Sequence, residues 1–276
     1  MDYDILSAKD AFLDLVIEKL GTHPIDYVEK INFIRSTQQS LEAHQAAGVL
    51  LLLRYRDGQF FFQLIKRSLR TAQAGDLSCP GGMLHTSIDS LLRPLVAARV
   101  AAILRKDTAN YAREKGHETF KVITLFLANA ARESWEEIRL KPCNLLFLGP
   151  LPCYCLTLRR RTIFPLVGFI KHECTFRTNS EVDKTFEIPL KAFFDPENFC
   201  RYMILAPDPT NPLKYNQREY PCLTHADQGV QEILWGATFN IILSFLRIVL
   251  DYEPPQKRSD RAFKKILSAQ YMKGHQ

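Results

Sequence analysis

The segment ARESWEEIRL, residues 131–140, places acidic side chains at a spacing that could support chemistry. Glu133, Glu136 and Glu137 stand at positions i, i+3 and i+4, so on a helix their carboxylates lie on one side. Pro142 ends that helix, which places the acids in its last turns, where the helix dipole disfavours negative charge. Two interpretations follow. Either the acids form a solvated face balanced by basic neighbours, or they hold a divalent cation such as Mg²⁺, which prefers oxygen ligands.

Two glycines lie upstream of the acids in AGDLSCPGGMLH, residues 74–85. The Pro80-Gly81-Gly82 tripeptide follows an apolar stretch and lets the backbone turn sharply and approach a ligand closely. Such a tripeptide is most often only a turn. His85 follows at a distance from which it could reach a phosphate, although one loop histidine indicates little by itself.

Hydrophobic periodicity indicates the elements that must position these residues. It predicts strands at 46–55, 59–67, 145–149 and 162–170, and helices at 7–21, 89–106, 118–138 and 239–250. Asp57-Gly58 predicts a hairpin turn between the first two strands. Ser7 is expected to cap the first helix and Gly21 to end it.

Two later segments give weaker patterns. Residues 187–194, EIPLKAFF, are expected to run from a strand into a helix. The basic segment PPQKRSDRAFKKI, residues 254–266, is expected to form a solvated final helix, or else to face phosphate or membrane. The whole chain indicates one domain in which strands and helices are mixed.

Composition sets the outer limits. With 276 residues, 46% of them hydrophobic, the chain can form one large domain or two small ones. The net charge of +6 favours anionic partners without selecting one. The seven cysteines are odd in number and contain no CxxC pair, which favours a reduced intracellular protein, cytoplasmic or organellar. No targeting signal is expected, and the apolar stretch 239–250 is too short to span a membrane.

The glycines and the acidic helix together resemble the signature of the Nudix hydrolase family. That signature runs glycine, five residues, glutamate, seven residues, then REUxEExGU, where U is aliphatic. The matching residues are Gly82, Arg132, Glu133, Glu136, Glu137 and Leu140. The chain departs from the pattern at the first acid, for which Asp89 is the nearest candidate, and about 35 residues are then inserted before Arg132. Arg139 replaces the second glycine and Ser134 an aliphatic residue.

The surrounding sequence is similar to the coenzyme A diphosphatase branch of this family. Residues 64–82 carry Arg67, Ser68, Gly75 and the Pro80–Gly82 tripeptide at nearly the spacing of that branch. Later matches are FPLVGFI at 164–170, NSEVDKTFEIPL at 179–190 and EILWGATFNIILSFL at 232–246.

The resemblance implies an α/β (α+β) fold, an α/β/α sandwich with a mixed sheet and an inserted helical segment. The Nudix domain would cover 46–250 with the insertion at about 90–125. Residues 1–45 would be a helical segment that packs on it, and 251–276 a basic tail. The insertion is expected to lie beside the substrate cleft or at a subunit contact of a homodimer.

The resemblance also implies roles for residues. Glu133, Glu136 and Glu137 would bind Mg²⁺ or Mn²⁺, and Arg132 would orient them. The general base would be Glu133 or Glu181, and these alternatives stay open. Substrate would be bound by Arg67, Arg70 and the backbone of Gly81 and Gly82, with Arg159, Arg160 and Arg161 as further candidates for phosphate. Trp235 is expected to pack the final helix against the sheet rather than stack on adenine.

The expected reaction is metal-dependent hydrolysis of the diphosphate bond in coenzyme A or acyl-coenzyme A, which gives 3′,5′-ADP and 4′-phosphopantetheine or its acyl form. One alternative keeps the chemistry and changes the substrate to ADP-ribose, a dinucleotide or capped RNA, although a nucleic-acid partner is not favoured. Another alternative is a Nudix-like binding module without turnover, which the insertion and Arg139 would explain.

Overall fold

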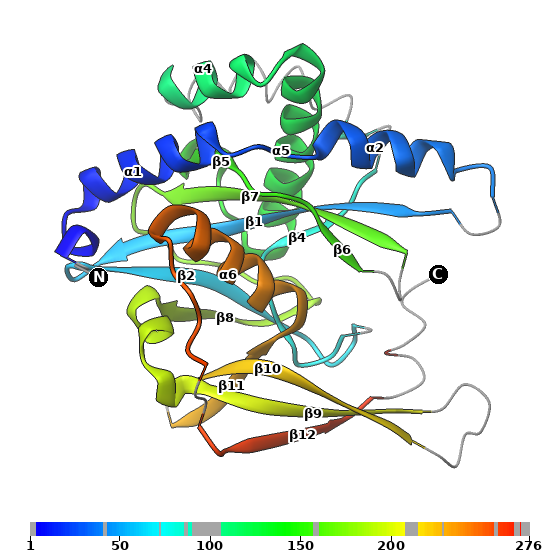
Figure 1. Cartoon of the computed structure of the whole chain (residues 1–276), viewed down its shortest axis with the longest axis vertical. Coiled ribbons are helices and arrows are strands. Elements are labelled where there is room, and N and C mark those ends of the chain that lie inside the picture. Colours follow the sequence, from blue (N-terminus) through cyan, green and yellow to red (C-terminus); the bar gives the residue numbers. More distant parts are fainter. Residues whose placement is uncertain are drawn as a thin grey trace.

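The computed structural model describes residues 4–40, 43–71, 73–85, 88–89, 106–156, 160–207, 215–227, 229–256, 259–267 and 271. Figure 1 shows helices and strands mixed along the chain, with helices on both sides of a central sheet and a second sheet beneath it. The predicted mixed α+β class is confirmed.

The central sheet is mixed. Its main path runs β3 (Leu77–Ser78), β2 (Gln59–Arg67), β1 (Gln45–Arg56), β7 (Arg161–Ile170) and β5 (Leu145–Pro150). Three strands lie off this path: β4 (Gly81–Met83) pairs with β1, β6 (Tyr154–Leu156) with β7, and β8 (Val182–Pro189) with β2. The β1–β7 pairing is parallel, whereas β1 and β2 form the predicted antiparallel hairpin. Asp57 and Gly58 both have positive φ, as a type I′ turn requires.

Helices cover both faces of this sheet. The alternation of side chains along β1 sends Leu51 and Leu53 into one core, shared with α1 (Lys9–Thr22) and α6 (Gly236–Leu250). Leu50 and Leu52 point into the other core, shared with α2 (Tyr27–Ser36) and α5 (His117–Ile138). The predicted α/β/α sandwich is therefore confirmed, and the helical segment before residue 46 packs on both faces of the sheet.

Aromatic packing holds α5 against the sheet. The ring of Phe126 stacks on that of Phe164 in β7 with centroids 3.8 Å apart. The fully buried Tyr27 of α2 packs edge-on against both rings and donates its hydroxyl to the carbonyl of Pro165 at 2.5 Å. The acidic C-terminal end of α5 is thus the end of a helix whose middle is fixed in the core.

A second sheet was not predicted from the sequence. It has the order β11 (Val230–Trp235), β10 (Tyr215–Asp227), β9 (Phe199–Pro207) and β12 (Ala262–Ile266). The prediction of a final helix over 254–266 was wrong, because β12 pairs in parallel with β9. Its side chains alternate between exposed and half-buried, and that period of two belongs to a strand.

Several other predictions can be compared with the structure. Helices at 7–21, 118–138 and 239–250 and strands at 145–149 and 162–170 are confirmed within a few residues. Residues 187–194 pass from β8 into the 3-10 helix η4 (Leu190–Phe194), as expected. Of the insertion, α4 (Lys106–Glu114) and the start of α5 are helical, while 90–105 and most of the predicted 89–106 helix lie outside the described residues. The remaining short 3-10 helices are η1 (Asp4–Ser7), η2 (Pro142–Asn144) and η5 (Pro196–Asn198).

The expected ends of the first helix were wrong. Ser7 belongs to η1, and α1 is preceded by Ala8 with no capping side chain. Gly21 lies inside α1, where a Cβ atom would come 2.5 Å from Cγ of Tyr111 in α4. The glycine therefore permits close packing of two helices rather than ending one. None of the described helices has the length and apolar character needed to cross a membrane.

Candidate active site

A cavity of about 1180 Å³ contains most of the residues that the sequence singled out. Its lining residues come from the central sheet, the acidic end of α5 and the second sheet. Its polar part includes Arg67, Gly81, Gly82, His85, Arg132, Glu133, Glu136, Glu137 and Glu181. Part of the remaining wall comes from the central sheet, including Ala47, Val49, Tyr154 and Ile163. The rest comes from the second sheet, the start of α6 and the segment after β12, including Ile204, Ala206, Arg218, Tyr220, Trp235 and Leu267.

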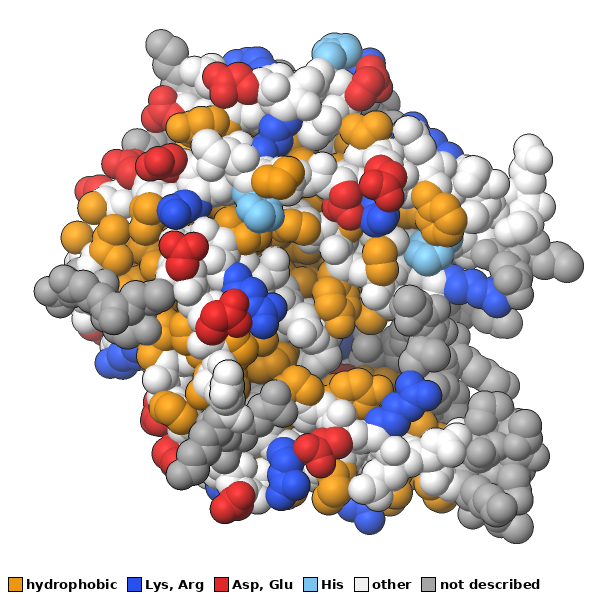
Figure 2. Space-filling view, in the orientation of Figure 1, with side chains coloured by type: hydrophobic (Ala, Val, Ile, Leu, Met, Phe, Trp, Pro, Cys, Tyr) orange, Lys and Arg blue, Asp and Glu red, His pale blue; other side chains and the backbone are white. Residues whose placement is uncertain are grey.

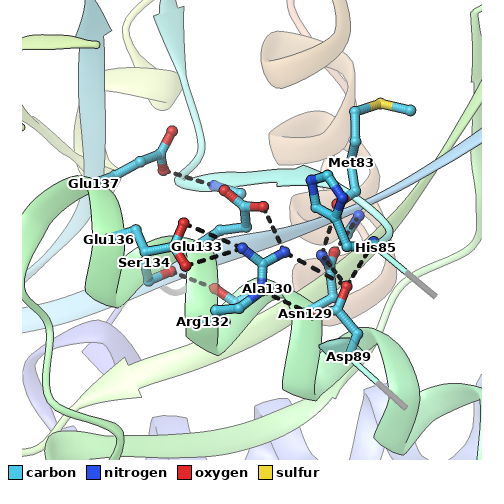
Figure 3. Close-up of polar contacts among 12 residues, drawn as sticks. Met83, His85, Asp89, Asn129, Ala130, Arg132, Glu133, Ser134, Glu136 and Glu137 are labelled. Atoms are coloured by element: carbon cyan, nitrogen blue, oxygen red, sulfur yellow. Dashed lines mark hydrogen bonds and ion pairs between the residues drawn. The ribbon is translucent and has the colours of Figure 1, made fainter. Parts of the chain in front are cut away.

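Arg132 stands at the centre of the acidic cluster (Figure 3). Its Nη2 atom donates to Glu133 Oε1 at 2.8 Å, and Nη1 donates to both oxygens of Glu136 at 3.1 Å. Its Nε atom donates to Asp89 Oδ1, also at 2.8 Å. One guanidinium group thus fixes three carboxylates at once, which is the arrangement expected of a residue that orients the acids.

Asp89 reaches this cluster in spite of the insertion that separates it from Arg132 in sequence. Its side chain is completely buried and accepts hydrogen bonds from the backbone N–H of His85 at 2.8 Å and from Asn129 Nδ2 at 3.0 Å, besides those from Arg132. A buried carboxylate requires such partners, because burial removes its hydration and only hydrogen bonds and an opposite charge compensate for that loss.

Asn129 is a residue of the site that the sequence analysis missed. It is fully buried in α5, accepts from the backbone N–H of Gly48 and donates to the carbonyl of Met83, both at 3.0 Å. With its bond to Asp89, the amide connects α5, β1, β4 and the first acid (Figure 3). The signal was an asparagine within an apolar helical run, three residues before Arg132, which a packed core tolerates only when its amide is fully bonded.

The two glycines bring the backbone of β4 against α5. The N–H of Gly81 donates to Glu137 Oε2 at 2.9 Å. At Gly81, which has a φ of +147°, a Cβ atom would come 2.3 Å from the carbonyl oxygen of Gly48. At Gly82 it would come 2.5 Å from Cδ of Glu133. A side chain at position 81 would therefore collide with the backbone of β1, and one at position 82 would collide with the carboxylate of Glu133.

Burial makes Glu133 and Glu137 costly to ionise. Desolvation raises the pKa of Glu137 to about 8, although the Gly81 N–H and the positive charge of Arg67 act in the opposite direction. Desolvation also raises the pKa of Glu133, against the lowering effect of Arg132. Burial acts to lower the pKa of Arg132, but its bonds to Asp89 and Glu136 and the charge of Glu133 raise it overall. A cation among these carboxylates would remove much of the cost.

The candidate ligands, Glu133, Glu136 and Glu137, all offer carboxylate oxygens, which are the ligand atoms that a hard divalent cation prefers. The predicted convergence is only partly present. Within the described part of the chain, no three acidic, histidine or cysteine side chains gather closely enough to hold a metal. The reason is that Arg132 binds Glu133 and Glu136, whereas Glu137 turns to the Gly81 N–H.

The structure places the predicted substrate residues unequally. Arg67 lines the cavity, and its buried Nε atom has no hydrogen-bond partner among the described residues. Arg70 is exposed in the turn after β2 and does not reach the cavity wall, so the structure does not bring it to the site. Arg161 lines the cavity and Arg160 lies in the turn before β7, while residue 159 lies outside the described residues.

Glu181, the second candidate for the general base, is exposed at the cavity wall. Two bonds tie its loop to the segment after Arg67: the Ser68 N–H donates to the carbonyl of Glu181 at 2.8 Å, and Ser68 Oγ donates to that of Ser180 at 2.9 Å. The geometry thus brings Glu181 and Arg67 to one region and leaves the choice between Glu133 and Glu181 open.

Trp235 also lies at the cavity wall, and its contacts fit the packing role expected for it. Its ring packs against those of Tyr202 and Tyr220, with centroids 5.2 and 5.7 Å away. Its Nε1 atom donates to Asp76 at 3.1 Å, which anchors the start of α6 to the loop before the glycines.

Arg139 occupies a position where the backbone favours glycine. Its φ of 58° is left-handed. Its N–H donates to the carbonyl of Trp135 at 3.0 Å and the N–H of Leu140 donates to that of Ser134 at 3.3 Å, and these bonds end α5. Its guanidinium lies 5.3 Å from the centroid of the Trp135 ring. The departure from the family pattern therefore preserves the helix end at some cost in strain and removes no acidic residue.

Comparisons with known proteins give similarity at the level of structure alone. The chain matches no protein-family model and no curated protein. Similar solved structures include a Caenorhabditis elegans Ap4A hydrolase, with a TM-score of 0.34 and 13% identity over 53% of this chain and 81% of its own. They also include the Nudix hydrolase RenU from Mycobacterium smegmatis, with a TM-score of 0.36 and 13% identity over 55% of this chain and 74% of its own.

A third similar structure is the Nudix domain of Shewanella oneidensis NrtR, which was solved with ADP-ribose. Its TM-score is 0.34, with 13% identity over 55% of this chain and 77% of its own. All of these scores and identities are low, so membership of the Nudix family stays a prediction.

Replacing Glu137 with glutamine should make the stability of the metal-free protein less dependent on pH. Because the folded-state pKa of about 8 lies above the ordinary carboxyl value, this group's stabilising contribution is full below the ordinary value and is lost as pH rises through 8. Thermal melting in chelator should therefore show a steeper fall in Tm between about pH 5 and 9 for wild type than for Glu137→Gln. Glu114→Gln, at an exposed site on α4, is the control. An equal fall of Tm with pH in wild type, Glu137→Gln and Glu114→Gln would contradict the conclusion that burial raises the pKa of Glu137.

Replacing Arg139 with glycine should stabilise the fold by about 0.5–1 kcal/mol. The left-handed backbone costs a side-chain-bearing residue about 1–2 kcal/mol, part of which is offset by the greater freedom of unfolded glycine and the lost ring contact. Urea unfolding measures the change. Arg113→Gly, within helix α4, should instead lose about 1 kcal/mol. A loss of stability in Arg139→Gly would mean that contacts of the arginine outweigh the strain.

Proposed function

We propose that the protein hydrolyses the diphosphate bond of coenzyme A or its thioesters, in a reaction that depends on Mg²⁺ or Mn²⁺ and gives 3′,5′-ADP and 4′-phosphopantetheine or its acyl form. The observation that carries the proposal is that Glu133, Glu136 and Glu137, the glycine strand and Arg67 line one cavity. Its volume of about 1180 Å³ is larger than that of most ligand pockets, as a nucleotide joined to a second large group requires.

The acids need a positive partner before a diphosphate can approach them. When bound, Mg²⁺ or Mn²⁺ supplies this charge, stabilises the leaving phosphate and makes water a better nucleophile. Glu133, Glu136 and Glu137 are the proposed ligands, and release of Glu133 and Glu136 from Arg132 would free them for this role.

The other groups of the chain would bind and orient the substrate. Arg67, with its unbonded Nε atom, is the proposed phosphate ligand, since a guanidinium group can contact two oxygens at once. The backbone of Gly81 and Gly82 would pass close to the diphosphate, because no side chain intervenes there. Glu133 or Glu181 would take the proton from the attacking water, and water adds across the P–O–P bridge as that bond breaks.

Rival substrates share the chemistry and differ in the group attached to the diphosphate. ADP-ribose and dinucleotides fit a cavity of this size. For capped RNA, a basic surface beside the cavity would be expected. On the face shown in Figure 2, the described basic side chains are interspersed with acidic ones, which does not favour this substrate. An inactive binding module would retain the cavity and show no turnover.

Glu136→Gln should abolish hydrolysis while leaving the protein folded, because the side chain is half-exposed and lies at the cavity wall. Product release from coenzyme A, ADP-ribose, a dinucleoside polyphosphate and capped RNA would be measured with Mg²⁺, with Mn²⁺ and with chelator. Glu118→Gln, exposed at the other end of α5, is the matched control and should keep full activity.

Four outcomes of this panel decide between the proposed function and its alternatives. Hydrolysis that is fastest with coenzyme A and is lost in Glu136→Gln supports the proposal. Faster hydrolysis of ADP-ribose or capped RNA rejects the coenzyme A assignment. Full activity in Glu136→Gln rejects the site assignment, and binding without turnover in wild type identifies a binding module.

A further inference from the structure

Strand β10 of the second sheet presents one of its faces to the cavity. Alternate residues of the strand line the cavity, namely Asn216, Arg218 and Tyr220. The residues between them do not line it, and one of these, Glu219, pairs with Arg201 at 3.9 Å. The acid that follows Arg218 in the sequence is therefore turned away from it. Arg218 thus brings a positive charge to the cavity from the second sheet, whereas Arg67 comes from the central sheet.

The charge of Arg218 is not matched by an acid. Within the part of the chain that the structure describes, its guanidinium group forms no ion pair and no hydrogen bond. Arg132, in contrast, is bonded to three carboxylates, and Arg161 donates to the side chain of Gln45 at 3.2 Å. An unmatched guanidinium group that lines a cavity favours an anionic ligand there, and its planar fork suits the oxygens of a phosphate.

The pairing of the second sheet defines the place of Arg218. Arg218 is opposite Ile204 in β9, and Ile204 is opposite Lys265 in β12, so the three side chains share one face of the sheet. Two strand spacings, about 10 Å, separate the backbone of Arg218 from that of Lys265. Arg218 therefore lies in the same row as Lys265, at a distance that leaves room for a separate ligand group.

Asp76, whose carboxylate reaches this row, already has its partners. It accepts hydrogen bonds from three side chains: Lys265 Nζ at 2.5 Å, Trp235 Nε1 at 3.1 Å and the hydroxyl of Tyr271. Its backbone carbonyl accepts from the N–H of Arg67 at 3.0 Å. Lys265 matches the charge of Asp76, and Asp76 connects the segment of Arg67 to the second sheet. Arg67 and Arg218 thus offer two positions for anionic groups in one cavity.

Tyr220 adds an aromatic ring to the same face of β10. It follows Arg218 by two positions, which is about 7 Å along a strand. The ring is half-buried and packs against that of Trp235 with centroids 5.7 Å apart, which restricts its movement. A nucleoside whose base lies against Tyr220 would bring a phosphate on its ribose within reach of Arg218.

We infer that Arg218 binds the 3′-phosphate of coenzyme A, a group outside the diphosphate bond that is hydrolysed. This inference rests on the proposed diphosphatase function and names a residue that selects its substrate. The diphosphate lies at Arg67 and the glycine strand, and the phosphate on the ribose lies at Arg218. ADP-ribose and dephospho-coenzyme A carry no such phosphate. Arg218 is therefore a specificity residue and takes no part in breaking the bond.

Removal of the Arg218 side chain tests this with two substrates that differ only in the 3′-phosphate. The ratio of kcat/KM for coenzyme A to that for dephospho-coenzyme A would be measured in each variant. Arg218→Ala should lower the ratio about tenfold, because coenzyme A loses a charge-assisted contact and dephospho-coenzyme A loses none. Arg218→Lys should lower it less, since the charge remains and only the fork is lost. Arg201→Ala is the control: it removes the same charge from a residue of the second sheet that does not line the cavity, and it should keep the wild-type ratio.

Nucleotide binding tests the same contact without turnover. In calorimetry with wild type, 3′,5′-ADP should bind more tightly than 5′-AMP, which lacks only the 3′-phosphate. Arg218→Ala should reduce this difference by the same factor as the kcat/KM ratio, and Arg201→Ala should preserve it. Binding of 2′,5′-ADP distinguishes the position of the phosphate on the ribose. Thermal melting shows whether each variant is folded, and loss of the exposed Arg218 side chain should leave Tm unchanged.

The outcomes distinguish failure of this inference from failure of the proposed function. If wild type hydrolyses coenzyme A and the folded Arg218→Ala variant keeps the wild-type ratio, the inference is overturned. An equal fall for coenzyme A and dephospho-coenzyme A overturns it as well, and so does an equal change of the ratio in Arg201→Ala. A dependence on Arg218 that appears with 2′,5′-ADP and not with 3′,5′-ADP also overturns it. If wild type hydrolyses neither coenzyme A compound, the proposed function fails first and the inference falls with it.

Discussion

The contact between the backbone of β4 and the acids of α5 is the constraint on which the site depends. The Gly81 N–H bonds Glu137, and Gly82 lies so close to Glu133 that any side chain would collide with its carboxylate. This contact buries negative charge at the end of a helix, where the dipole adds to the cost. The raised pKa values of Glu133 and Glu137 express that cost, and a cation at the site would relieve it. In a protein that bound no cation here, neutral residues in place of Glu133 and Glu137 would make the fold more stable.

A polar network fixes the two sides of this contact against each other. Asn129 bonds the backbone of β1 and β4 from α5, and it shares Asp89 with Arg132. Asp89 thereby connects the segment before the insertion to the helix after it. The residues on the two sides of the insertion are therefore joined through side chains that lie outside it.

The sequence was most informative where local patterns decide the structure. The hairpin at Asp57-Gly58, the helices α1, α5 and α6 and the apolar strand β1 depend on near neighbours, and each was predicted. Local patterns failed for the second sheet, because polar residues and prolines within its strands obscure the alternation of apolar side chains. In addition, β12 pairs with β9, a strand about 60 residues earlier in the sequence. The many basic residues of segment 254–266 led to the prediction of a solvated helix instead of a strand.

The same limit applies to the site. The spacing of Glu133, Glu136 and Glu137 placed them on one helix face, and the neighbouring arginine was correctly associated with them. Asn129 and Asp76 could not be assigned, since their partners lie between 40 and 195 residues away. Nor could the sequence show that Arg132 and the Gly81 N–H draw the three acids toward different partners, because that is decided by competition among side chains in the folded cavity.

The central claim is that the carboxylates of α5 hold a divalent cation beside the glycine strand. Its most direct test is a crystal soaked with Mn²⁺ and coenzyme A, from which an anomalous difference map is calculated at a wavelength where manganese scatters anomalously. We predict a manganese peak ligated by oxygens of Glu133, Glu136 and Glu137, with the diphosphate between it and Arg67. A map with coenzyme A in the cavity and no manganese peak among these three side chains would contradict the account.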